Sequence, residues 1–133
     1  MNVRKGTPPV ISEAQIMTKA AVIAADRLGL DTATFATTIG VSETRIVEMT
    51  RLEDLLRKGT PPFERALLLI RLFRTLKHAG DEITARKWLH EQNDAMGCRP
   101  IEMVTEPDNL GKLIRHLEDE AMAREPGCMD GVQ

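Results

Sequence analysis

The sequence is poor in aromatic residues, with three Phe, one Trp and no Tyr among 133 residues. Large aromatic side chains are enriched in β-strands, so their scarcity leaves Leu, Ile, Ala and Met to fill a core, which favours helices. The chain also has little net charge, −2 at pH 7. A strong nonspecific nucleic-acid binder is basic, so any DNA binding must come from a local patch or from several copies acting together.

Cysteines and long apolar runs are scarce as well. Cys98 and Cys128 lie far apart, and the histidines are scattered, so the close spacing of a metal site is absent and we expect neither metal nor cofactor. No histidine has an obvious Ser or Cys partner, which makes an enzyme the least favoured function. The most apolar run, Leu67–Ile70, is too short for a bilayer, and Ala20–Ala25 is too short for a signal peptide. We therefore expect a cytoplasmic protein that makes no membrane contact.

Caps and breakers predict an all-α protein. Ser12 and Gln15 form a capping box, Gly29 ends the first helix, and Asp81 caps a later one. The expected helices cover residues 12–28, 31–39, 43–58, 62–79, 82–92, 100–104 and 107–122. We divide the chain into a flexible arm (1–11), a helix-turn-helix domain (12–60), a second helical domain (61–123) and a tail (124–133).

The helix-turn-helix prediction depends on residues 32–51. Gly40 provides the left-handed conformation of the turn, Ala36 provides the small residue at the helix crossing, and Ser42 caps the second helix. Apolar residues occupy the positions that should be buried, which are Phe35, Ile39, Val41, Ile46 and Met49. The alternative is an ordinary helical hairpin with a glycine turn.

The second helix of this motif would carry the DNA contacts. The predicted DNA-binding residues are Ser42, Glu43, Thr44, Arg45, Val47, Glu48 and Arg51. Base edges and phosphates favour Arg, Lys, Asn and Gln, and two glutamates on this helix are therefore unfavourable. Residues 1–58 contain eight Lys and Arg against seven Asp and Glu, a balance of only +1. Operator DNA is therefore expected to be bound by an oligomer or together with a partner.

The later helices carry apolar faces that suit either a core or a protein interface. The helix after Pro62 has one apolar stripe through Leu69 and Phe73 and further leucines on another face, so it is buried on several sides. Trp88 is most often a core anchor in such a helix. The residues predicted to lie in an interface with a partner protein or a second copy are Leu68, Leu72, Phe73, Trp88, Leu113 and Leu117.

A series of motifs over roughly residues 22–118 resembles the Xre/MbcA/ParS-type antitoxins. The motifs are Leu28-Gly29-Leu30, Gly40-Val41-Ser42, Lys58-Gly59, Arg71-Leu72-Phe73-Arg74, Gly80-Asp81, Ala85, Trp88-Leu89, Asn93, Met96-Gly97, Arg99-Pro100-Ile101-Glu102 and Leu110-Gly111. The resemblance implies a dimeric antitoxin that neutralises a protein toxin of the RES or ADP-ribosyltransferase-like class. It makes residues 61–123 the helical toxin-binding and dimerisation domain, and the six interface residues named above its toxin-binding or dimer-interface residues. It also implies repression of the antitoxin's own operon. The alternative is a free-standing transcription regulator that uses the same helix-turn-helix.

Overall fold

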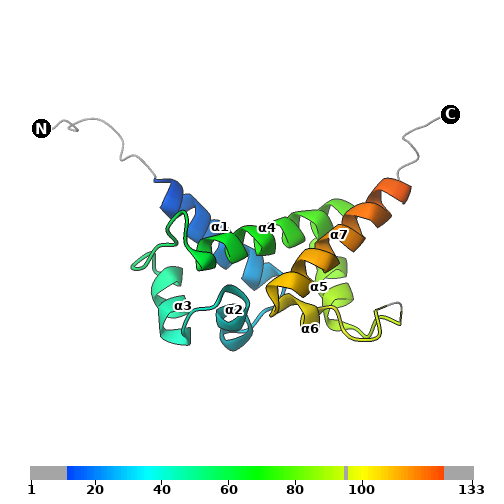
Figure 1. Cartoon of the computed structure of the whole chain (residues 1–133), viewed down its shortest axis with the longest axis horizontal. Helices are drawn as coiled ribbons and strands as arrows, with labels where there is room; N and C mark the ends of the chain where they lie inside the picture. Colours follow the sequence, from blue (N-terminus) through cyan, green and yellow to red (C-terminus); the bar gives the residue numbers. More distant parts are fainter. Residues whose placement is uncertain (1–11, 95, 125–133) are drawn as a thin grey trace, which may run out of the picture.

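The computed structural model describes residues 12–94 and 96–124. Over these residues the fold is helical, as the composition predicts, with one isolated antiparallel bridge between Asn93 and Cys98. The helices, in chain order, are α1 (Glu13–Arg27), α2 (Thr32–Ile39), α3 (Glu43–Thr50), α4 (Pro61–Ala79), α5 (Glu82–His90), α6 (Ile101–Val104) and α7 (Pro107–Arg124) (Figure 1). In this part of the chain no helix combines the length and the apolar character that crossing a membrane requires.

The caps read from the sequence are present. In the capping box of α1, the Gln15 N–H donates to the Ser12 hydroxyl at 3.1 Å, and the Ser12 N–H donates to the Gln15 side chain at 3.0 Å. Asp31, Ser42 and Asp81 each accept the backbone N–H three positions further on, at the starts of α2, α3 and α5. These bonds satisfy N–H groups that have no partner within their own helix.

Helix α4 lies at the centre of the molecule and packs against α1, α2, α5 and α7. In Figure 1 it runs across the view, with α1 crossing it and α7 beside its C-terminal half. Two prolines occupy its first positions, where their missing N–H is not needed. Its buried residues are Phe63, Ala66, Leu69, Leu72 and Leu76, whereas Leu67 is 40% exposed, so the helix is central to the core but not covered on every side.

The hydrophobic core is one continuous cluster. It contains residues from every helix, for example Ala21 of α1, Ile46 of α3 and Leu113 of α7. The two regions that we separated at residues 60 and 61 therefore share one core, and α4 contributes to both sides of that boundary.

Helix α3 is shorter than predicted. We expected it to continue to about Lys58, just before Gly59 and the pair Pro61-Pro62, which interrupt a helical pattern. It ends at Thr50, and the N–H groups of both Arg51 and Glu53 bond to the carbonyl of Glu48. Leu56 is instead fully buried, and its N–H donates to the hydroxyl of Thr18 on α1 at 2.8 Å. Inserting Leu56 into the core draws the chain away from the helical path.

Helix α5 contacts the C-terminal end of α1. The guanidinium of Arg86 donates to the carbonyls of Asp26 at 2.8 Å and Arg27 at 3.2 Å, and the His90 ring contacts the carbonyl of Leu28 at 3.0 Å. Arg27 in turn forms an ion pair with Glu82 at 2.8 Å. A cation at the C-terminus of a helix interacts favourably with the helix dipole. We call this set of bonds the α1–α5 contact.

Candidate functional site

The connection between α2 and α3 has the local geometry that the sequence predicts. Gly40 adopts a left-handed conformation, with φ 79° and ψ 40°, and its N–H bonds to the carbonyl of Ala36 at 2.8 Å. A Cβ at position 40 would meet the guanidinium end of Arg65 on α4, a flexible group that can move aside, so the positive φ is what favours glycine here. Ser42 then starts α3 by accepting the N–H of Arg45 at 3.1 Å. The two short helices pack against each other and against the rest of the core.

The apolar positions assigned to this motif also face inwards. Four of the residues predicted to be buried are almost inaccessible, namely Phe35, Ile39, Ile46 and Met49, and Ala36 lies among them. Val41 is half-buried and packs against the same cluster. The pattern in the sequence therefore identified the inner side of α2 and α3 correctly.

The predicted DNA-binding residues lie on the opposite side of α3. Six of them are exposed: Ser42, Glu43, Thr44, Val47, Glu48 and Arg51. The seventh, Arg45, is partly buried, and its guanidinium forms an ion pair with Asp54 at 2.6 Å. A cation held this closely by a carboxylate is less available to a phosphate, so the exposed part of this surface is less basic than its composition suggests. This pair could not be predicted, because Asp54 was placed inside a longer helix, far along it from Arg45.

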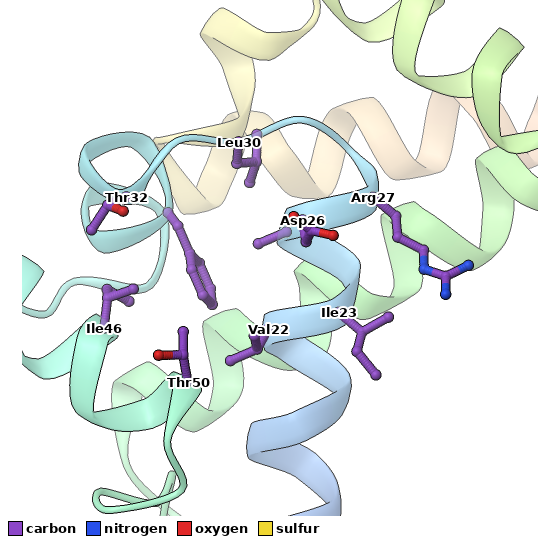
Figure 2. Close-up of a pocket in the computed structure, with 10 residues that line it drawn as sticks. Val22, Ile23, Asp26, Arg27, Leu30, Thr32, Ile46 and Thr50 are labelled. Carbon is purple, nitrogen blue, oxygen red and sulfur yellow. The ribbon is translucent and has the colours of Figure 1, made fainter.

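A cavity of about 330 Å³ lies between α1, α2 and α3. Figure 2 shows Val22 of α1 on one side of it and Ile46 and Thr50 of α3 on the other, with Arg27 pointing away. The buried Phe35 of α2 also lines it. Its lining mixes aliphatic side chains with polar ones, among them Asp26 of α1 and Thr32 of α2.

The predicted toxin-binding or dimer-interface residues divide into two groups. Leu72 and Leu113 are completely buried in the core of the single chain, and Leu117 is 7% exposed. The other group, Leu68, Phe73 and Trp88, is half-buried and reaches the surface. Only this second group can contact a partner without a change in the core.

Trp88 and Leu117 meet in a hollow at one end of the molecule. The hollow has a volume of about 130 Å³ and lies where the end of α4 meets α5 and α7. It is lined by Leu76, Ala79, Gly80, Thr84, Ala85, Trp88, Leu117 and Glu120. We call it the Trp88 hollow. Sequence reasoning named two of its residues but could not foresee the hollow, which forms only when three separate helices converge.

Charged side chains of α4 make two further contacts. Arg71 of α4 donates two hydrogen bonds to the carboxylate of Glu118 on α7, both at 2.8 Å, and this interaction raises the pKa of Arg71. The ammonium of Lys77 lies 5.6 Å from the centre of the Phe73 ring, within the range of a cation–π interaction. Arg71 and Phe73 belong to the motifs that carry the resemblance, and here both contact neighbouring charged groups.

The groups that could perform chemistry are dispersed. His90 contacts a backbone carbonyl in the α1–α5 contact, and His116 contacts the carboxylate of Glu120 at 3.2 Å on the same helix. Over residues 12–94 and 96–124 no three His, Cys, Asp or Glu side chains come close enough together to hold a metal ion. No model of a known protein family matches the chain, and no curated protein matches it either.

Proposed function

We propose that this chain is the antitoxin of a type II toxin–antitoxin pair and that it binds a protein toxin through α4, α5 and α7. The observation that carries the proposal is the Trp88 hollow, an apolar depression within the segment whose motifs resemble the antitoxin family. Tryptophan at the edge of a hollow is a frequent anchor of protein interfaces, because it contributes a large apolar surface at a low entropic cost.

The chemistry of the surface around the hollow suits a protein partner. Thr84 and Glu120 give the hollow a polar rim around its apolar lining, and the half-buried Leu68 and Phe73 offer further apolar surface elsewhere on α4. An apolar centre with a polar border is the usual composition of a protein interface. The volume of the hollow is on the scale of one side chain, so a single apolar residue of the toxin would fill it. A toxin of the RES or ADP-ribosyltransferase-like class follows from the family resemblance alone.

The test is co-purification with the product of the neighbouring gene. We expect the wild-type chain to form a stable complex with that protein and to relieve its toxicity on co-expression.

Thr84→Arg should weaken the complex by at least about tenfold, because it places a charge and a long side chain at the hollow without altering a buried residue. Ile83→Arg is the matched control. Ile83 precedes Thr84 in the same helix, but its side chain is 80% exposed and does not line the hollow. Equal affinities for the two variants would remove the hollow from the interface, and no complex with any neighbouring product would end the proposal.

A second role, repression of the operon, is favoured by α2 and α3. In this proposal they form a helix-turn-helix, and the exposed face of α3 enters the major groove. The low positive charge of this face implies weak binding by one copy, in line with an oligomer on a repeated operator. A free-standing transcription regulator would need the same contacts but no toxin.

Gel shifts on the DNA upstream of the gene distinguish these roles. A sequence-selective shift at low salt is expected for the wild-type chain, and both Arg51→Ala and Thr44→Ala should weaken it. Arg74→Ala removes the same charge from an exposed position on α4 and should leave the shift unchanged. A selective shift without any toxin complex would favour the free-standing regulator, whereas the absence of a selective shift would exclude both DNA-binding roles.

A further inference from the structure

Helix α1 carries an exposed apolar face that no other part of the described chain covers. A groove of about 370 Å³ runs along it, lined by Gln15, Ile16, Lys19, Ala20, Ile23 and Leu52. Ile16 is 58% exposed, Leu52 40% and Ile23 39%. Single exposed apolar residues need no explanation, but three large ones in one groove mark an interaction surface.

The spacing along this face is that of a helix that pairs with another helix. Ile16 and Ile23 are seven residues apart, and Glu13, Ala20 and Arg27 form an adjacent row with the same interval. In helices that pair with each other, the contact surface consists of two such rows offset by three residues. We call the two rows of α1 the α1 seam; its middle is apolar or small and its two ends are charged. This seam is separate from the core stripe of α1, which contains Ala21 and Leu28.

Leu52 reaches the groove through a strained backbone conformation. Leu52 has a φ of 59° and is the one residue other than glycine with a positive φ over the described part of the chain. A bulky residue in this conformation is strained, and such strain persists where the surroundings or the function require it. Here it results in an exposed leucine side chain beside Ile16 and Ile23.

We infer that a second copy of this chain docks on this face, with the two α1 helices antiparallel about a two-fold axis near Ala20. This inference does not depend on the binding of a toxin or of DNA. The small side chain of Ala20 at the axis allows the helices to approach closely, and Ile16 of each copy then lies beside Ile23 of the other. Such an interface is isologous, so every contact occurs twice.

Charge complementarity favours a second copy over another occupant. Position 20 is midway between Glu13 and Arg27, so the antiparallel arrangement brings the acidic end of one seam to the basic end of the other. The Arg27 side chain is still 46% exposed in its pair with Glu82, which leaves guanidinium surface for a second carboxylate. A parallel arrangement would bring like charges together at both ends.

Sedimentation of the full chain tests the inference. We expect wild-type protein to be a dimer at micromolar concentration and Ile16→Glu to raise the dimer Kd by at least about tenfold. Ile83→Glu, at the most exposed large apolar residue outside the seam, should sediment like the wild type. Leu52→Gly should also weaken the dimer while leaving the unfolding of the monomer no easier, because glycine adopts a positive φ without strain. A monomeric wild-type chain at about 100 µM would overturn the inference.

Disulfide trapping tests the position of the axis. In a Cys98→Ser, Cys128→Ser background, Ala20→Cys should form an intermolecular disulfide upon mild oxidation, because symmetry places the two Cβ atoms close together. Ile83→Cys in the same background is the control and should cross-link far more slowly. A dimer that survives Ile16→Glu, or one that Ala20→Cys cannot trap, uses another face and contradicts the inference.

Discussion

At the scale of single residues, Thr18 connects a loop to a helix through one hydroxyl group. It is completely buried, donates to the carbonyl of Ala14 at 2.7 Å and accepts the N–H of Leu56 at 2.8 Å. The second bond is the important one, because the N–H of Leu56 has no helical partner where the chain leaves α3. A threonine in a stripe of alanines looks ordinary in the sequence, and its bonding partner lies 38 residues away.

Thr18→Val should therefore destabilise the protein by about 1 to 3 kcal/mol, the cost of leaving a buried N–H without an acceptor. Urea unfolding monitored by circular dichroism measures it. Thr37→Val is the matched control: its hydroxyl bonds back to the carbonyl of Ala33 from an exposed position, so we expect a change within about 0.5 kcal/mol. If the two variants lose the same stability, the bond to Leu56 contributes nothing.

Gly29 also has a role that depends on a distant neighbour. Its φ is 78°, and a Cβ there would lie 3.0 Å from Nε2 of His90 and 3.3 Å from the side chain of Arg86. Gly29→Ala thus incurs backbone strain of about 1 to 2 kcal/mol together with crowding in the α1–α5 contact.

A second alanine variant separates these two costs. Gly59 has a similar φ of 87° with open space around it, so Gly59→Ala carries the backbone strain alone. We expect Gly29→Ala to cost roughly 1 kcal/mol more in thermal unfolding, as typical of overpacking. The difference should shrink in a His90→Ala background. A difference that does not depend on residue 90 would place the crowding elsewhere.

At the scale of elements, the aspartates that cap α2 and α5 make the stability of these helix starts depend on pH. Hydrogen bonds from Thr34 lower the pKa of Asp31 below its ordinary 3.8, and those from Thr84 do the same for Asp81. A carboxylate with a lower pKa in the folded state stabilises the fold above its unfolded pKa. This contribution is lost as the pH falls through the folded value.

The unfolding free energy should therefore decrease below about pH 4 in the wild-type chain, in part through these two caps. Asn caps a helix about as well as Asp but does not titrate, so Asp31→Asn with Asp81→Asn should flatten this acid limb. Thermal unfolding between pH 2 and pH 7 measures the slope. Asp94→Asn, at an exposed turn position outside any helix cap, is the control for the loss of a carboxylate. An unchanged slope in the double variant would exclude a role of the caps.

The elements show which features a sequence can predict. Caps and breakers are local, so the starts of α1, α3 and α5 followed from Ser12, Ser42 and Asp81. The end of α3 did not, because it depends on the burial of Leu56 and on its bond to Thr18, and both need the folded chain. The same holds for the interfaces. Apolar periodicity predicted the faces of α4 and α7 but could not tell the buried Leu72 from the half-buried Leu68.

At the scale of the whole molecule, α4 holds the two halves together. It packs on α1 and α2 on one side and on α5 and α7 on the other, so neither half has a complete core of its own. The α1–α5 contact joins the halves a second time. The single cluster of buried residues is typical of a chain that unfolds in one cooperative transition.

A fragment of residues 1–60 should accordingly lack a cooperative thermal transition, since it loses Ala66 and Leu69, which are completely buried. The full chain should show one transition with equal calorimetric and van't Hoff enthalpies. Differential scanning calorimetry of both proteins makes the comparison. Two separate transitions in the full chain, or a sharp one in the fragment, would show that the halves fold on their own.

The double packing of α4 also restricts how such a chain can change over evolutionary time. A genetic exchange with a crossover near residue 60 would deliver α4 together with α5 and α7 but separate it from the α1 and α2 against which it packs. The hybrid would meet a mismatched surface at Ala66 and Leu69. New specificity for a partner is therefore more readily acquired by changes at the half-buried Leu68 and Trp88 than by recombination of whole halves.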